Sequence, residues 1–203
     1  PLVTLGAFLL WIGWFGFNGG SAFNISSVDN ANSVALIILN TNTAGLAGAI
    51  IAAIIVYLQY KKLDITMILN GALGGLVAIT AGAHVVGLWE PIVIGAIGGA
   101  LVVYAVPMFD KLKIDDPVGA LSVHLVNGIW GTIAVAIFAD VSMIAQLKAI
   151  VVVGVFTFSV SFVAVQVLNK LFPLRVGEEE EYEGLDISEI GVESYPDFVK
   201  SKI

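Results

Sequence analysis

Apolar residues occur along this chain in six long blocks, separated by short segments that hold nearly all of the charged residues. A helix needs about 20 residues to cross a bilayer, and most of the blocks approach or exceed that length. The pattern predicts an all-α, polytopic membrane protein with six transmembrane helices. The predicted spans are residues 2–22, 33–60, 65–83, 91–107, a fifth that holds His124 and ends near residue 139, and 149–172.

Charge is distributed unevenly between the apolar blocks and the C-terminal end. Hydrophobic residues make up 58% of the chain and charged residues 12%, whereas charged residues make up about a quarter of soluble domains. From residue 174 onward lie nine of the sixteen acidic residues but three of the nine basic residues, so this part carries most of the net charge of −7. We therefore divide the chain into a transmembrane domain, residues 1–173, and a solvated tail, residues 174–203.

Basic residues cluster after the second, fourth and sixth predicted spans, while the intervening loops hold only Lys148. The clustered residues are Lys61, Lys62, Lys111, Lys113, Lys170 and Arg175. Loops rich in lysine and arginine tend to stay on the cytoplasmic side of a membrane. We expect a multi-pass protein of the cell membrane whose first span runs outward and whose tail is cytoplasmic.

His124 is the one ionisable side chain between Asp116 and Asp140. At 1.5 Å per residue its ring would lie about 12 Å along the fifth span, well inside the membrane. Ionisable groups at such depth usually mark a pathway for a substrate or ion. The alternative is a packed histidine whose ring nitrogens are hydrogen-bonded to neighbours. Three glycines on the same segment, which allow a close approach of helices or ligands, favour a pore-lining histidine.

Phe17 and Ser21 lie one turn apart at the outer end of the first predicted span and therefore share a helix face. Each has an ordinary alternative role, because Phe17 could face lipid or the core and Ser21 could simply end the helix. Asp115 and Asp116 precede Pro117, an arrangement that caps a helix N-terminus. We expect a structural role for both carboxylates, and Asp116 could also hold a backbone kink near a pore.

Other classes of function find no support in the sequence. It contains no Walker loop, dinucleotide fingerprint or HExxH motif, and the spacing of His84 and His124 suggests no metal site. The basic, aromatic-rich surface of a nucleic-acid-binding protein is also missing. We expect neither an enzyme nor a cofactor. Since Pro1 is not an initiator, we interpret the chain as a fragment or as one chain of a split protein.

The tail begins with the charge run EEEE at residues 178–181 and continues with Asp186 and Glu189 at capping-box spacing. We expect a cytoplasmic segment that docks on the membrane domain or on a partner protein.

Five motifs in register resemble the ammonium transporter family, Amt/MEP/Rh, over nearly the whole chain. They are GWFGFNGGSA (13–22), NTNTAG (40–45), NGALGGLVAITAG (70–82), DDPVGALSVHLVNGIWGT (115–132) and GLDISEIGVESYPD (184–197). The resemblance implies eleven transmembrane helices in two inverted halves plus a last helix, assembled as a homotrimer with one pore per subunit. This chain resembles helices six to eleven. The first five, with the first pore histidine, would come from the same polypeptide or from a partner chain.

The resemblance also implies roles for individual residues. Ser21 matches the serine of the outer ammonium-recruitment site, Phe17 a gating phenylalanine beneath it, and His124 the second of two pore histidines. Asp116 matches the aspartate at the base of that histidine's helix. The tail resembles the segment that contacts the neighbouring subunit and meets PII-type regulatory proteins, although Ile190 stands where many relatives have histidine.

These observations predict transport of ammonium or ammonia, with recognition outside followed by conduction past His124. An ammonium sensor that signals through its cytoplasmic tail is the main alternative. A membrane scaffold subunit without a pore is another, against which the Phe17, Ser21 and His124 pattern argues.

Overall fold

The computed structural model describes residues 1–172 and 174–194 and divides into two compact units, Pro1–Val151 and Val152–Ile203. The division falls within a long helix, so each unit is described by itself. The predicted boundary between membrane domain and tail, at residues 173 and 174, stays a prediction. Pro173 and the end of the tail motif from residue 195 lie outside the described residues.

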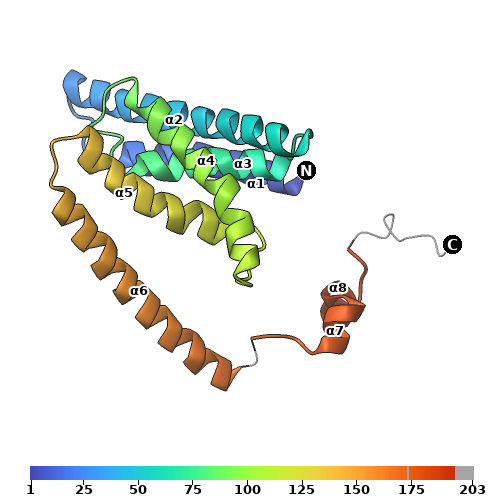
Figure 1. The fold of residues 1–203 in the computed structure, drawn as a ribbon. Coiled ribbons are helices and arrows are strands. Elements are labelled where there is room, and N and C mark those ends of the chain that lie inside the picture. The colour runs from blue at the N-terminus through green and yellow to red at the C-terminus, as the bar shows by residue number, and fades with distance from the viewer. Residues whose placement is uncertain (173, 195–203) are drawn as a thin grey trace. The chain divides into compact units, whose positions relative to one another are not determined.

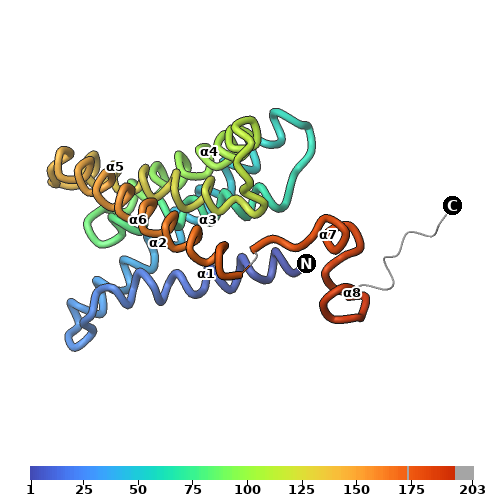
Figure 2. Tube along the Cα trace, turned by 90° about the horizontal axis from the view of Figure 1, so that it is seen from below, coloured from blue at the N-terminus to red at the C-terminus, as the bar shows by residue number. Residues whose placement is uncertain are grey.

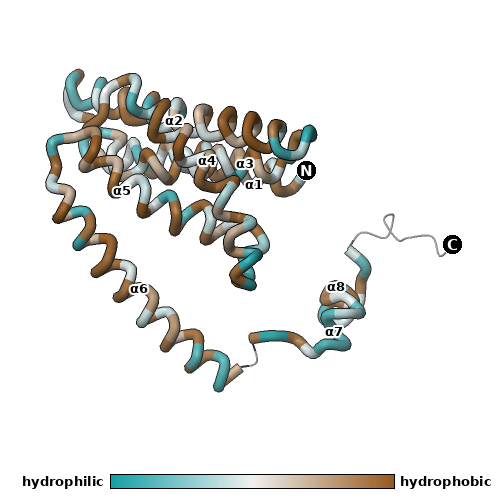
Figure 3. The backbone as a smooth tube through the Cα atoms, viewed as in Figure 1, coloured by the Kyte–Doolittle hydropathy of each residue, from teal (hydrophilic) through white to brown (hydrophobic). Residues whose placement is uncertain are grey.

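Every regular element that the structure describes in the first unit is helical, as the sequence predicted (Figure 1). Among the described residues five helices, one of them the continuous segment Leu121–Phe138, are long and apolar enough to cross a membrane, and α3, with 16 residues, is shorter. The elements are α1 (Leu2–Gly20), α2 (Val28–Tyr60), α3 (Ile65–Thr80), α4 (Glu90–Lys111), the π-helical segment η1 (Leu121–Leu125), α5 (Val126–Phe138) and α6 (Met143–Leu171), which begins in this unit. Apolar residues dominate these helices and polar ones gather at their ends (Figure 3).

Helix α2 begins five residues earlier than predicted. The hydroxyl of Ser27 accepts a hydrogen bond from the backbone N–H of Asn30 and caps the helix there. The polar residues that follow Ser27 are thereby drawn into the helix, although their polarity is typical of a loop.

Helices α2, α3 and α4 pack against one another and form the centre of the first unit (Figure 2). Their backbones approach closely at glycines. A Cβ atom added to Gly99 of α4 would overlap the carbonyl oxygen of Gly48 on α2. Helix α1 packs on α2 and α3, and α5 packs on α3 and α4. The buried Leu76 of α3 lies in the cluster that also receives Trp14 of α1 and Val123 of η1. Helix α3 thus connects the two elements that carry the predicted site residues.

The second unit contains the rest of α6 and two short helices, α7 (Glu178–Glu183) and α8 (Leu185–Ile190). No residue of α6 is buried. The predicted capping box is wrong, because α8 begins after Gly184 and Asp186 lies within its first turn. The carboxylate of Asp186 instead accepts hydrogen bonds from the backbone N–H groups of Ile187 and Ser194, which folds the chain back on α8.

Candidate functional site

Ser21, Phe17 and Trp14 lie along one face of α1. The hydroxyl of Ser21 donates to the carbonyl oxygen of Phe17 at 2.7 Å. The Phe17 ring meets the Trp14 ring edge to face, with centroids 6.1 Å apart and planes at 72°. The Ser21 hydroxyl donates its proton to the Phe17 carbonyl. The lone pairs of the Ser21 oxygen stay free to accept a hydrogen bond from a donor outside the helix.

Trp14 connects this helix face to His124. The two rings stack nearly parallel, with centroids 6.2 Å apart and planes at 12°. The Trp14 indole N–H donates to the hydroxyl of Thr80 at 2.8 Å, and that hydroxyl donates to the carbonyl of Leu76 at 2.7 Å. Both bonds hold the indole against α3. Ser21, Phe17, Trp14 and His124 therefore form a continuous series, which we call the aromatic line.

The aromatic line lies at the surface of the first unit. Phe17 is 62% exposed and His124 is exposed, whereas Trp14 is half-buried. Beside the line is an open groove of about 310 Å³, lined by Leu9, Leu10, Gly13, Trp14 and Phe17. Aromatic faces attract cations, whereas the rest of the groove wall, formed by Leu9, Leu10 and Gly13, is apolar. The line can therefore accept a small cation that donates hydrogen bonds, provided that another surface covers the groove.

Asp116 does not lie on the aromatic line but supports the segment that carries His124. One carboxylate oxygen accepts from the backbone N–H of Leu121 at 3.0 Å. The other accepts from the N–H and the hydroxyl of Ser122, at 3.0 and 2.9 Å. Desolvation raises the pKa of Asp116, but these hydrogen bonds outweigh it, so the pKa lies below its ordinary value. The carboxylate thus caps the start of η1 in its ionised form.

The loop between Asp116 and η1 turns at Gly119, whose φ of +78° strains any residue with a side chain. A Cβ atom there would lie 2.7 Å from the side-chain nitrogen of Asn70, which donates to the carbonyl of Val118 at 3.3 Å. The start of η1 is held by Asp116, Gly119 and Asn70. These contacts give the backbone that carries His124 a defined position.

Trp14 does not stand out from the sequence by itself, although it lies within one of the motifs that do. Residues 14, 17 and 21 have the i, i+3, i+7 spacing of one helix face, and this spacing was the available signal. The contact with Thr80 had no such signal, because it joins two helices that are distant in the sequence.

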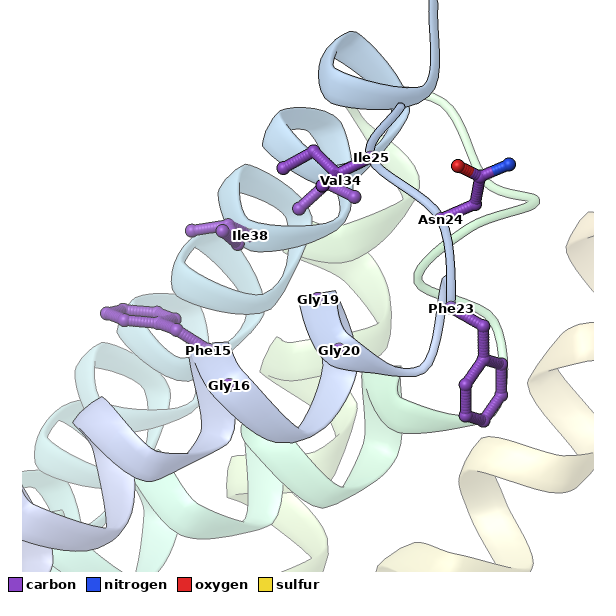
Figure 4. A pocket seen from close by; sticks show the side chains of 9 residues that line it. All are labelled: Phe15, Gly16, Gly19, Gly20, Phe23, Asn24, Ile25, Val34 and Ile38. Atoms are coloured by element: carbon purple, nitrogen blue, oxygen red, sulfur yellow. The ribbon is translucent and has the colours of Figure 1, made fainter. Parts of the chain in front are cut away.

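A larger hollow of about 490 Å³ lies on another face of the same end of α1, between it and α2 (Figure 4). It is lined by Phe15, Gly16, Gly19, Gly20, Phe23, Asn24, Ile25, Val34 and Ile38. None of these side chains is ionisable, and none belongs to the aromatic line. Within the described part of the chain, no group of three or more His, Cys, Asp or Glu residues could hold a metal ion. We therefore take the aromatic line as the candidate site.

Comparison with known proteins gives a consistent family assignment. Residues 1–195 match the model of the Ammonium Transporter Family. The chain is 39% identical to the ammonium transporter Amt2 of Archaeoglobus fulgidus, over 97% of this chain and 46% of that protein. It is 37% identical to the ammonium transporter of Bacillus subtilis, over 95% of this chain and 51% of that protein. Among solved structures, one titled Sensor Amt Protein matches with a TM-score of 0.85 and 39% identity, over 93% of this chain and 49% of that one.

The chain spans about half the length of these relatives. The family model nevertheless covers nearly all of this chain, and the relatives share more than a third of its residues over that length. The helical structure agrees with a multi-pass membrane protein, and the family is one of transporters and not of enzymes. The chain therefore belongs to the ammonium transporter family.

Proposed function

We propose that this chain forms helices six to eleven of an ammonium transporter and carries one wall of its pore. The observation that carries the proposal is the aromatic line, in which the Ser21 hydroxyl bonds the backbone carbonyl of Phe17 and the rings of Phe17, Trp14 and His124 follow one another. Its order agrees with the orientation predicted from the basic residues, with Ser21 outermost and His124 deepest. The other wall is contributed by five further helices, from the same polypeptide or from a partner chain.

Ammonium is recognised at the outer end of the line. Moving a bare monovalent cation from water into an apolar medium costs several kcal/mol or more of free energy. The site must therefore replace the hydration of the ion. The free lone pairs of Ser21 accept one N–H bond, and the Phe17 ring faces the charge, a contact worth roughly 0.5–2 kcal/mol. We assign the gate to Phe17 from the family resemblance, and its exposed ring lies next to Trp14 on the line.

Conduction follows past Trp14 and His124. The apolar groove favours neutral ammonia over ammonium, so the ion gives up a proton on the way. The His124 imidazole offers a hydrogen bond to the passing nitrogen or relays that proton. Asp116 takes no direct part and supports the backbone that positions His124.

Replacing His124 by leucine tests the proposal in the full-length native protein reconstituted in liposomes. We expect ammonium-evoked current to fall by roughly tenfold or more, or selectivity against potassium to be lost, as when a proton-transfer group is removed. His84→Leu is the matched control, because His84 is exposed in the connection between α3 and α4. Current and selectivity that both stay unchanged in His124→Leu would contradict a relay role.

A second candidate function is an ammonium sensor that binds its ligand at the aromatic line and signals through the cytoplasmic tail. The observation that favours it is the match to the structure titled Sensor Amt Protein. Uptake of labelled methylammonium into vesicles separates the two functions, because a sensor without conduction binds the ligand but does not accumulate it. The same assay separates a transporter from a scaffold subunit, because a scaffold does not accumulate the ligand either.

The remaining partners follow from the family. We propose a homotrimer in the cell membrane, with the tail on the cytoplasmic side and within reach of a neighbouring subunit. A PII-type protein is the expected regulator. Chemical cross-linking of the native membrane protein followed by mass determination tests the trimer, and a pull-down with a purified PII-type protein tests the regulator.

A further inference from the structure

The backbone around His124 is wound differently from the helix that follows it. Where η1 meets α5, the N–H of Val126 is shared between the carbonyls of Leu121 and Val123, and the bond to Leu121 reaches back five residues, where a regular α-helix uses a partner four residues earlier. Such π-helical turns hold an extra residue, are rare and occur mostly as single turns, frequently at functional sites. A wide turn of this kind needs support from side chains.

Asn127 provides that support from the C-terminal side. Its side-chain N–H donates to the carbonyl of Ser122 at 3.4 Å. Ser122 lies two residues before His124 and Asn127 three residues after it, so the amide spans the turn on both sides of the histidine. Asp116 holds the other end through the N–H groups of Leu121 and Ser122. Ser122 is thus held from both directions.

The side chain of Asn127 is closely surrounded by backbone. The side chain is fully buried between α3 and α4. A Cβ atom on Gly74 would lie 3.0 Å from its nitrogen, and one on Gly98 would lie 3.0 Å from its oxygen. Its oxygen has no hydrogen-bond partner within the described residues. Reversing the amide would point that oxygen at the Ser122 carbonyl, where two acceptors would repel each other.

A buried, unpartnered amide oxygen destabilises a protein, and an apolar residue of similar volume avoids that cost. Stability alone therefore does not explain an asparagine at this position. What Asn127 supplies, and an apolar residue could not, is the hydrogen bond to Ser122 across the His124 turn.

We infer that Asn127 is a positioning residue for His124, which it holds against Trp14 by stabilising the π-helical turn. This inference rests on the proposed function, in which the His124 ring lines the pore. Without the amide donor the Ser122 carbonyl loses its side-chain partner, the turn relaxes, and the imidazole leaves its stack with Trp14. The outer end of the aromatic line, at Ser21 and Phe17, is left unchanged because it lies on α1 and does not contact Asn127.

Two variants of the full-length protein test the inference. Asn127→Leu keeps the volume and removes the donor, and Asn127→Ala removes the donor without any risk of overpacking between Gly74 and Gly98. The matched control is Asn40→Ala, because Asn40 is also buried and donates its amide to backbone carbonyls, those of Ala83 and Val86, far from His124 in the sequence.

The first readout is the nuclear magnetic resonance signal of the His124 ring, assigned by its loss in His124→Gln. We expect the ring protons to lose the shift that a stacked indole produces in both Asn127 variants, and to keep it in Asn40→Ala. The second readout is methylammonium uptake per assembled protein. The maximal rate should fall roughly tenfold or more, as for a misplaced catalytic group, while the half-saturating concentration stays unchanged.

Each outcome decides the question. If the Asn127 variants keep the ring signal and the uptake rate, the inference is wrong. If neither variant assembles, or if Asn40→Ala changes the ring signal equally, Asn127 is a folding residue and the inference is also wrong. The proposed function fails separately, when the native protein takes up no methylammonium or when His124→Leu changes nothing. In that case the ring signal still shows whether Asn127 positions His124.

Discussion

Two regions of the first unit are built from opposite kinds of residue. Where α2 meets α4, glycine backbones such as those of Gly48 and Gly99 touch, and no side chain stands between them. Along the aromatic line large rings stand at the surface, and Phe17 leaves more than half of its area exposed. One region is packed within this chain, and the other is an open surface that we propose to be one wall of a passage.

The difference shows how rigidity and access are divided. Backbone contacts between helices leave little room for rearrangement, since the interior cannot yield without separating whole helices. The aromatic line is fixed only where it touches that interior, through the bond from Trp14 to Thr80 and through the support of η1. If the aromatic line lines a passage, its side chains can move while the helices that carry them stay fixed.

The largest expected effect belongs to the helix contact. Gly99→Val places two methyl groups where the Gly48 carbonyl lies, which forces α2 and α4 apart. Overpacking against a side chain costs about 1–3 kcal/mol, and a rigid backbone should raise the loss beyond roughly 3 kcal/mol. The yield of assembled protein after detergent extraction and the midpoint of thermal unfolding measure it.

The control for that variant is Gly6→Val on α1, since a Cβ placed there meets no described atom within 4 Å beyond its chain neighbours and its own helix backbone. Both variants put a β-branched residue inside a helix, so the difference between them isolates the helix contact. Equal yields and equal midpoints would show that the α2–α4 contact is not the rigid part of the unit.

The second effect concerns the support of η1. Asp116→Ala removes the acceptor of three hydrogen bonds, and losing a helix cap costs typically about 1 kcal/mol and up to about 2. Because the pKa of Asp116 is lowered in the folded protein, its stabilising contribution is present above the unfolded pKa, near 3.9. The contribution disappears as the pH falls through the folded pKa.

The stability difference between the native protein and Asp116→Ala should therefore be largest near neutral pH and vanish in acid. Thermal unfolding at pH 7 and at decreasing pH measures it. Asp115→Ala is the control, because Asp115 makes no side-chain hydrogen bond within residues 1–172 and 174–194. A stability difference for Asp116→Ala that does not change with pH would show that the carboxylate does not act as an ionised cap.

The sequence predicted the helices well and the contacts between them poorly. Apolar blocks bounded by charges determine where a membrane helix can lie, because an unpaired charge inside lipid is costly. The start of α2 was missed because a cap at Ser27 outweighed the polarity of the residues after it.

For the candidate site, Phe17 and Ser21 could be grouped by helical spacing, and His124 stood out as an isolated ionisable residue. The π-helical winding of η1 was not predictable in this way. It depends on Asp116 before the turn and on Asn127 after it, and Asn127 acts from between two other helices. A kink held by Asp116 beside a pore stays a prediction for function, although the hydrogen bonds that would hold it are present.

A smaller effect is expected where the aromatic line meets the interior. Thr80→Val keeps the shape of the side chain but removes the acceptor of the Trp14 indole. The unpartnered N–H should cost about 1 kcal/mol of stability and lower the uptake rate a few fold, since the indole can then turn away from His124. Thr132→Val is the control, because Thr132 also donates to a carbonyl one turn earlier but accepts from no indole.

If both threonine variants lower uptake equally, the loss comes from the hydrogen bond that each threonine donates to the carbonyl one turn earlier. The bond from Trp14 to Thr80 is then not needed for transport. If Thr80→Val alone lowers uptake, the line is fixed at the point where it touches α3. Uptake per assembled protein, with the thermal midpoint measured in parallel, separates the two results.

The smallest effect on stability, and the one that tests recognition alone, is expected at Ser21. Its hydroxyl is exposed and bonds only the carbonyl of Phe17, so Ser21→Ala should change the stability by less than about 0.5 kcal/mol. If the oxygen accepts a hydrogen bond from ammonium, a loss of roughly 0.5–1.5 kcal/mol raises the half-saturating concentration by about 2–10-fold, without a change in maximal rate. Ser33→Ala is matched to it, because Ser33 is likewise exposed and donates to the carbonyl four residues earlier. An unchanged half-saturating concentration in Ser21→Ala would leave Phe17 as the first group on this chain to meet the ion, and recognition would then depend on the aromatic face and not on the hydroxyl.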